Sequence, residues 1–83
     1  MKVVVRYFAS LREALGPTET LEIGPGATVG SVRSALIDRD AAHAAALNRG
    51  RAVRAALNQV LCDEDAGVEA GAEIGFFPPV TGG

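Results

Sequence analysis

The last eight residues, Phe76-Phe77-Pro78-Pro79-Val80-Thr81-Gly82-Gly83, limit the fold of this chain more than any other stretch. Prolines lack a backbone N–H donor and glycines lose the most conformational entropy on ordering, so the residues after the aromatic pair cannot continue a helix or a central strand. The aromatic pair itself is typical of a strand that ends in a core. We therefore predict a folded domain over residues 1–77 and a flexible diglycine tail over residues 78–83, which reaches roughly 20 Å when extended.

The composition excludes several classes of function. The chain has 83 residues, a formal net charge of −2, one cysteine and one histidine. This length suffices for one modest core, and the scattered basic residues argue against binding to nucleic acid. Cys62 has no partner for an internal disulfide, and Cys62 and His43 do not make a zinc set. The apolar run that ends at Arg6 is too short for a signal peptide or a membrane span, so we expect a soluble, cytoplasmic protein without a membrane partner.

Alternation of apolar residues predicts the first strand. Val3, Val5 and Tyr7 occupy every second position, which is the period of a half-buried strand. The same alternation places Phe8 on the outer face beside Arg6. An exposed aromatic residue at this position is not explained by the core.

Helix signals occur in three places. Ser10, with a glutamate three positions later, predicts a capped helix over residues 10–15. Thr28 is a good N-cap for the main helix, whose apolar stripe is predicted to be buried and whose polar residues, Arg33 among them, are predicted to face solvent. Asp40 is predicted to cap an alanine-rich helix that ends near Leu47.

The remaining strands are predicted over residues 18–23, 53–57, 60–62 and 73–77, with a tight turn at Asn58-Gln59. This order of elements indicates an α+β domain with helices packed on one face of a mixed sheet and with the first and last strands side by side in its centre. The predicted core consists of Val3, Val5, Tyr7, Leu21, Ile23, Val32, Leu36, Leu57, Ile74 and Phe76.

Two residues with reactive side chains have no predicted catalytic role. His43 lies in the alanine-rich helix without a second ligand or base at matching spacing, so we expect an exposed side chain. Cys62 has no cationic neighbour, and the acidic residues 63–65, predicted to form a solvated turn, should raise its pKa. No paired carboxylates, nucleophile-base pair or phosphate-binding glycine loop is recognisable, so the chain is not expected to be an enzyme by itself.

The C-terminal stretch from Phe76 to Gly83 resembles, residue for residue, the C-terminal signature of the small subunits of molybdopterin synthase, the MoaD-type sulfur carriers. Weaker similarity covers the rest of the chain, through Tyr7-Phe8-Ala9, Leu11-Arg12-Glu13 and Ala56-Leu57-Asn58-Gln59. This resemblance implies a ubiquitin-like β-grasp fold with an extended C-terminal tail. Ala70 and Ala72 depart from the family pattern, in which acidic residues often flank the glycine between them.

The resemblance also implies the chemistry. The carboxyl group of Gly83 would be adenylated by a ubiquitin-activating-type adenylyltransferase that uses ATP, and then converted to a thiocarboxylate that donates sulfur to cyclic pyranopterin monophosphate. The large subunit of molybdopterin synthase would hold the pterin in a heterotetramer, so this chain would bind no cofactor and no metal itself. The residues expected to thread into the partner's active site are Pro78, Pro79, Val80, Thr81 and Gly82.

Four residues are predicted to bind the partners. Phe8, Leu61 and Phe77 are placed by strand alternation on the outer face of the sheet, where large apolar groups are unusual in a soluble monomer. Arg12 matches the family's Leu-Arg-Glu segment and is expected to add a polar contact at the rim. Two alternative functions keep the same fold, namely a sulfur carrier for another pathway, such as the thiazole of thiamine, and a ubiquitin-like protein modifier.

Overall fold

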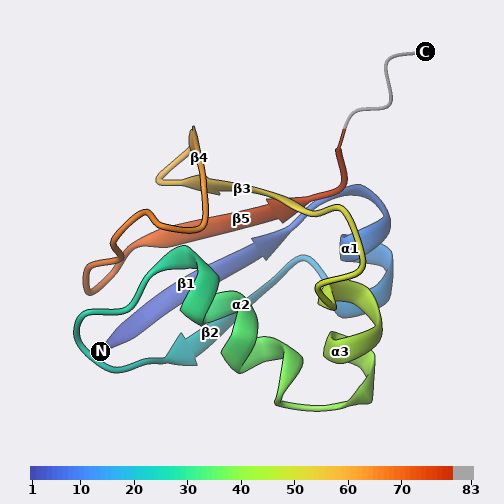
Figure 1. Cartoon of the computed structure of the whole chain (residues 1–83), viewed down its shortest axis with the longest axis horizontal. Coiled ribbons are helices and arrows are strands. Elements are labelled where there is room, and N and C mark those ends of the chain that lie inside the picture. Colours follow the sequence, from blue (N-terminus) through green and yellow to red (C-terminus); the bar gives the residue numbers. More distant parts are fainter. Residues whose placement is uncertain (80–83) are drawn as a thin grey trace.

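The computed structural model of the chain describes residues 1–79. The elements follow one another as β1 (Lys2–Tyr7), α1 (Ala9–Leu15), β2 (Thr18–Glu22), α2 (Val29–Ile37), α3 (Ala41–Leu47), β3 (Arg54–Leu57), β4 (Val60–Cys62) and β5 (Glu73–Phe77) (Figure 1). The strands form one sheet in the order β2-β1-β5-β3-β4. β1 and β5 are parallel neighbours at its centre, and the other pairs are antiparallel. The predicted α+β class and the central pairing of the terminal strands are confirmed.

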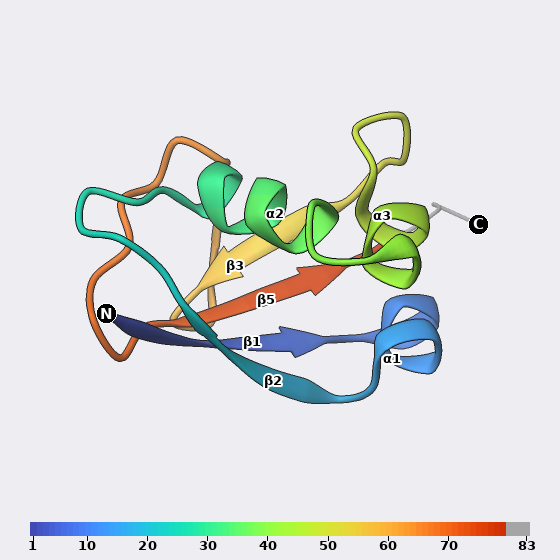
Figure 2. The same ribbon diagram turned by 90° about the horizontal axis from the view of Figure 1, so that it is seen from below.

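Helices α2 and α3 lie over the same face of the sheet, and α1 lies at the end toward which β1 and β5 run (Figure 2). The inward residues of β1 are at most 1% exposed, and Ile74 and Phe76 of β5 are fully buried beside them. Leu21, Ile23 and Leu57 are only partly buried against this core. The first two belong to the edge of the sheet, where β2 has a neighbour on one side only. No helix within residues 1–79 is long and apolar enough to cross a membrane.

The predicted N-caps of α2 and α3 are confirmed. The side chain of Thr28 accepts a hydrogen bond from the backbone N–H of Ser31, and the side chain of Asp40 does the same for His43. The prediction that Ser10 caps the first helix is wrong. The residue before α1 is Phe8, and Ala9 turns the chain with φ of 53°, so Ser10 already lies within the first helical turn.

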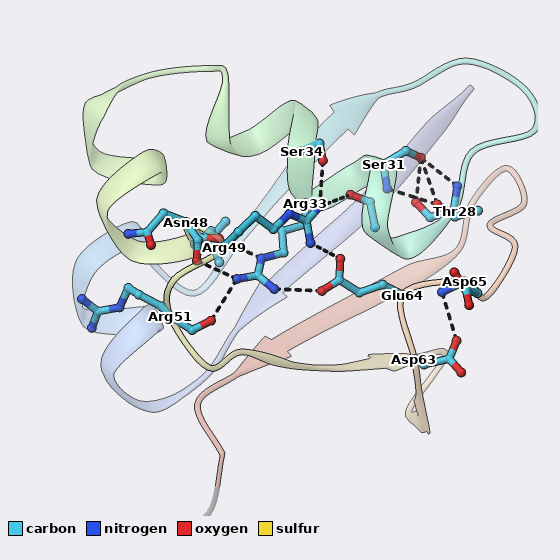
Figure 3. Close-up of polar contacts among 12 residues, drawn as sticks. Thr28, Ser31, Arg33, Ser34, Asn48, Arg49, Arg51, Asp63, Glu64 and Asp65 are labelled. Atoms are coloured by element: carbon cyan, nitrogen blue, oxygen red, sulfur yellow. Dashed lines mark hydrogen bonds and ion pairs between the residues drawn. The ribbon is translucent and has the colours of Figure 1, made fainter.

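The prediction that Arg33 faces solvent is also wrong. Arg33 is 4% exposed, and its guanidinium donates hydrogen bonds to the carbonyl oxygens of Leu47, Asn48 and Arg51 at 2.7–3.1 Å (Figure 3). A further bond of 2.8 Å joins it to the carboxylate of Glu64. This side chain therefore fastens the end of α3 and the loop before β3 to α2 and to the loop after β4.

Glu64 was expected to lie in a solvated turn, but it is half-buried between two arginines. Arg49 binds its second carboxylate oxygen and also donates to the carbonyl of Gly30 and the hydroxyl of Ser34 (Figure 3). Burial tends to raise the pKa of Glu64, but the bonds from Arg49 and Arg33 outweigh it and lower that pKa. Gly30 permits this approach, since a Cβ there would lie 3.1–3.2 Å from Glu64 atoms.

Candidate functional site

The sheet face turned away from the helices carries an apolar groove of about 400 Å³. We call it the outer-face groove. It is lined by Phe8, Ala56, Gln59, Glu73, Gly75 and Phe77. Phe8 is 41% exposed and Phe77 is half-buried, as strand alternation predicts for residues next to the inward Tyr7 and Phe76. Exposed apolar surface of this kind on a small domain is typical of a site that binds another molecule.

A glycine within β5 creates the floor of the groove. Gly75 is paired with Arg6 on one side and with Ala56 on the other, and its missing side chain leaves space for the ring of Phe8. A Cβ at position 75 would lie 3.1 Å from Cε2 of Phe8. The backbone N–H of Phe8 donates to the carbonyl oxygen of Phe76 at 3.1 Å, which holds the ring over the centre of the sheet. A glycine inside a strand pattern was the sequence signal for this close approach.

Charged side chains border the groove on one side. The guanidinium carbon of Arg6 lies 5.6 Å from the centroid of the Phe8 ring, within the range of a cation–π contact. Arg6 also approaches Glu73, with 3.7 Å between the charged atoms. Arg6 therefore lies against the Phe8 ring and close to Glu73, which lines the groove.

The other two predicted partner-binding residues lie beside the groove. Leu61 is 59% exposed and is paired with Ala56, so it extends the apolar surface onto β4 without lining the groove. Arg12 is exposed on α1, and its backbone N–H donates to the carbonyl oxygen of Phe8. The structure therefore brings Phe8 and Phe77 together, with Leu61 on one side and Arg12 one helical turn from Phe8.

The groove lies directly before the C-terminal residues. β5 ends at Phe77, and the half-buried Pro78 and Pro79 follow it. The remaining residues predicted to thread into a partner, Val80, Thr81 and Gly82, lie outside the described residues, as does the predicted reacting residue, Gly83. A partner that covers the groove would thus also meet the residues that lead to Gly83.

Cys62 has the properties of an unreactive thiol. Burial, together with the negative charge of Asp63, raises its pKa, so the nucleophilic thiolate is disfavoured. Of the three acidic residues expected to raise this pKa, Asp63 does so, and burial is the larger cause. Within residues 1–79, no three histidine, cysteine or acidic side chains are placed to hold a metal ion.

The expectation that His43 is exposed is wrong. Its side chain is buried on the helix side of the sheet, between the carboxylates of Glu19 and Asp40. Glu19 also accepts a 2.7 Å hydrogen bond from the hydroxyl of Tyr7 and pairs with Arg39. Sequence reasoning missed Glu19 because it lies 24 residues away, but Asp40, three residues before His43, was a usable signal.

Comparison with known proteins gives one family and two relatives that share a name. The model of the ThiS family matches residues 5–83. The molybdopterin synthase sulfur carrier subunit of Haemophilus influenzae is 39% identical over 79 residues, which are 95% of this chain and 96% of the relative. The protein of the same name from Escherichia coli is 37% identical over 98% of this chain and 99% of its own length.

Solved structures extend the likeness to the fold. SAMP1, the small archaeal modifier protein 1 of Haloferax volcanii, superposes with a TM-score of 0.79 at 28% identity, with both chains fully covered. A chain of the complex of subunits 1 and 2 of the molybdopterin-converting factor from Helicobacter pylori superposes with a TM-score of 0.68 at 26% identity, again with both chains fully covered. The expected ubiquitin-like β-grasp fold is confirmed.

Proposed function

Because the chain belongs to the ThiS family, whose model matches it from residue 5 to Gly83, we propose that it is the sulfur carrier subunit of a molybdopterin synthase. The observation that carries this assignment is the near full-length identity of 37–39% to two proteins of that name. The chain acts as the small carrier subunit of a two-subunit enzyme, and its partner is the large subunit. It is a carrier and does not itself catalyse the reaction.

The proposed chemistry resides in the carboxyl group of Gly83. A carboxylate oxygen attacks the α-phosphorus of ATP on an adenylyltransferase, and pyrophosphate leaves. A sulfur donor then attacks the acyl carbon, AMP leaves, and a thiocarboxylate remains. Its sulfur attacks a carbon of the pterin precursor, and an oxygen substituent leaves that carbon. Water then attacks the acyl carbon of the resulting thioester, which releases the pterin thiolate and restores the carboxylate. Gly82 and Gly83 suit this role because glycine adopts backbone angles that other residues avoid and fits a narrow channel.

The partner side of the proposal rests on the outer-face groove. Phe77 lines the groove and is followed by the residues that lead to Gly83, so one docking event both covers apolar surface and presents the tail. The pterin site belongs to the large subunit, the ATP site to the adenylyltransferase, and the complex is a heterotetramer. A cytoplasmic location is part of the same proposal.

A genetic test separates this function from the thiazole alternative. The chain should restore molybdopterin synthesis in an Escherichia coli strain that lacks its own carrier subunit, a protein 37% identical to this chain. It should not restore thiamine synthesis in a strain that lacks the thiazole sulfur carrier. Rescue of the thiamine strain alone would contradict the proposal.

Truncation of the groove should weaken partner binding without unfolding the domain. Burying one large apolar side chain is worth roughly 1.5–3 kcal/mol, so Phe77→Ala is expected to raise the Kd for the large subunit about tenfold or more. Val60→Ala is the matched control. Val60 is 68% exposed, but its strand partner Leu57 packs against the core, so Val60 belongs to the face of the sheet opposite the groove. Titration calorimetry with the large subunit measures both. Equal Kd values for Phe77→Ala and wild type would show that the groove is not part of the interface.

Filling the floor of the groove should act in the same direction. Gly75→Val would drive a branched side chain into the ring of Phe8, which a Cβ alone already approaches to 3.1 Å. The displaced ring should narrow the groove and weaken binding of the large subunit by about tenfold. This factor corresponds to the free energy lost when part of one aromatic side chain is no longer buried. If Gly75→Val binds like wild type while its circular dichroism is unchanged, the groove does not receive a partner side chain.

A second candidate, a ubiquitin-like protein modifier, is favoured by the likeness to SAMP1, a protein named as a modifier. Lys2 is the only lysine in the sequence, and the amino group of Met1 is held by the carbonyl of Ile23 and by Glu22. In a polymer of this protein, Gly83 of one copy would therefore form an isopeptide bond with Lys2 of the next. A ladder of conjugates on a denaturing gel that disappears when Gly83 is deleted would support this candidate.

A further inference from the structure

The ring of His43 is placed between two carboxylates. Nδ1 lies 2.8 Å from Oδ1 of Asp40, and Nε2 lies 2.7 Å from Oε2 of Glu19. Ionised carboxylates only accept hydrogen bonds, so each ring nitrogen has to donate one. A neutral imidazole has a single N–H, whereas an imidazolium has two. The geometry therefore requires a positively charged ring.

The other groups that face the ring agree with this charge. From β1, the hydroxyl of Tyr7 donates to the Glu19 oxygen that also meets the ring, and Arg39, just before α3, pairs with the second oxygen of Glu19. Asp40 additionally accepts the backbone N–H of His43 at 2.9 Å. The two carboxylates are thus balanced by His43 and Arg39.

The charges that act on the His43 ring are those of Glu19 and Asp40, and within residues 1–79 none comes from α1 or α2. A groove at the contact of α1 with α3 is lined on the α1 side by Ser10, Leu11 and Ala14. From α2, Arg33 reaches the carbonyl of Leu47 at the opposite end of α3. Within the part of the chain that the structure describes, the ring is therefore held by β1, β2 and the cap of its own helix.

We propose that protonated His43 is a charge clamp that fastens α3 to strands β1 and β2, and that α3 loosens from the sheet when the ring loses its proton. Loss of one N–H leaves one of the two carboxylates facing a ring nitrogen that has no proton to donate, and two lone pairs then oppose each other. The proposal is independent of the function proposed above, because the outer-face groove lies on the other face of the sheet.

The direction of the pH dependence follows from the pKa shifts. Burial alone would lower the pKa of His43, but its bonds to Glu19 and Asp40 raise it above the usual value of about 6.5. The clamp is therefore fully formed below about pH 6.5 and is lost as pH rises through the raised pKa. Bonds from His43 lower the pKa of Asp40, and bonds from His43 and Tyr7 lower that of Glu19 despite its burial. As pH falls, the clamp is therefore lost only when Glu19 or Asp40 gains a proton, which happens below the ordinary carboxyl pKa of about 4.

Nuclear magnetic resonance on the full chain tests the clamp. The ¹⁵N shifts of both ring nitrogens, followed from pH 5 to 9, should show imidazolium at pH 6.5 and a midpoint above 6.5. The protection factors of the α3 amides, corrected for intrinsic exchange, should fall as the ring loses its proton. The expected fall is about tenfold for each unit by which the pKa of His43 exceeds that of a free histidine ring. A midpoint at or below 6.5, or protection that stays flat through the titration, would overturn the proposal.

Variants of the two acids add a test that does not require replacing the histidine. Glu19→Gln and Asp40→Asn should each lower the midpoint of His43 by about one unit, because each removes one charged acceptor. Asp38→Asn is the matched control, an exposed acid two residues from Asp40 that has no contact with the ring. An equal shift in all three variants would mean that general surface charge, and not the clamp, sets the titration.

Discussion

Deleting Gly83 should abolish sulfur transfer while leaving the midpoint of thermal unfolding nearly unchanged. The buried core of the described residues lies between Val3 and Phe76, so the deletion removes none of these core side chains. The deletion removes the carbon that would carry sulfur. Adding one residue after Gly83 should have the same effect, because it displaces the reacting carbon by about 3.3–3.6 Å. Molybdopterin formation with purified large subunit, adenylyltransferase, ATP and sulfide measures the activity.

Asp38→Asn is the control outside the tail and the groove. Asp38 is exposed, so activity should stay within about twofold of wild type, the effect of a small surface change. Gly82→Val should behave like the deletion, since a branched Cβ restricts the backbone and widens the chain where a channel is narrow. Molybdopterin formation by the Gly83 deletion would contradict the proposed chemistry.

The largest loss of stability is expected from Arg33→Met. The change keeps an unbranched side chain as far as the position of Nε but removes the donors to three carbonyl oxygens and to Glu64. Removing one partner of a buried, hydrogen-bonded charge costs about 3–5 kcal/mol. For a domain of this size, such a loss lowers Tm by more than about 12 °C. Urea and thermal denaturation followed by circular dichroism measure both quantities.

Arg49→Gln is the control for this prediction. Arg49 binds the same carboxylate, but its side chain is 49% exposed, so its loss should cost no more than about 1 kcal/mol. The contrast separates the burial of Arg33 from the mere presence of an arginine next to Glu64. Equal losses for the two variants would mean that the cluster acts as a surface ion pair and that the buried donors contribute little.

Local patterns predicted the elements whose causes are local. Alternation over Val3, Val5 and Tyr7 gave the correct inward face of β1, and the capping side chains of Thr28 and Asp40 located the starts of α2 and α3. The turn at Asn58-Gln59 was also predicted, and both residues have the positive φ angles of a tight hairpin, 50° and 70°. These features depend on neighbours a few residues away, which the sequence displays directly.

The buried charges could not be predicted in the same way. Arg33 lies four residues after Val29 and three before Leu36, so helical spacing already placed it on the apolar stripe of α2, and its charge concealed this. Its partner Glu64 is 31 residues away, and Glu19 is 24 residues from His43. Such pairs become visible only when the register of the sheet and the packing of the helices are known.

The outer-face groove was predicted in part. Alternation identified Phe8 and Phe77 as outward residues, but the pairing of Gly75 with Ala56, which forms the floor, depends on the register between β3 and β5. Leu61 was correctly placed on the same face, although it lies beside the groove and not in it. The roles of residues Val80 to Gly83 in threading and in sulfur transfer stay predictions from the sequence and the family.

The central claim is that Gly83 carries the transferred sulfur, and the intact mass of the protein tests it most directly. The wild-type chain is incubated with the adenylyltransferase, ATP and a sulfide source, and the Gly83 deletion is treated in parallel. The account predicts that one oxygen of the wild-type chain is replaced by sulfur at Gly83, that the deletion is unchanged, and that adding the large subunit with the pterin precursor restores the original mass. An unchanged mass of the wild-type protein after activation would contradict it.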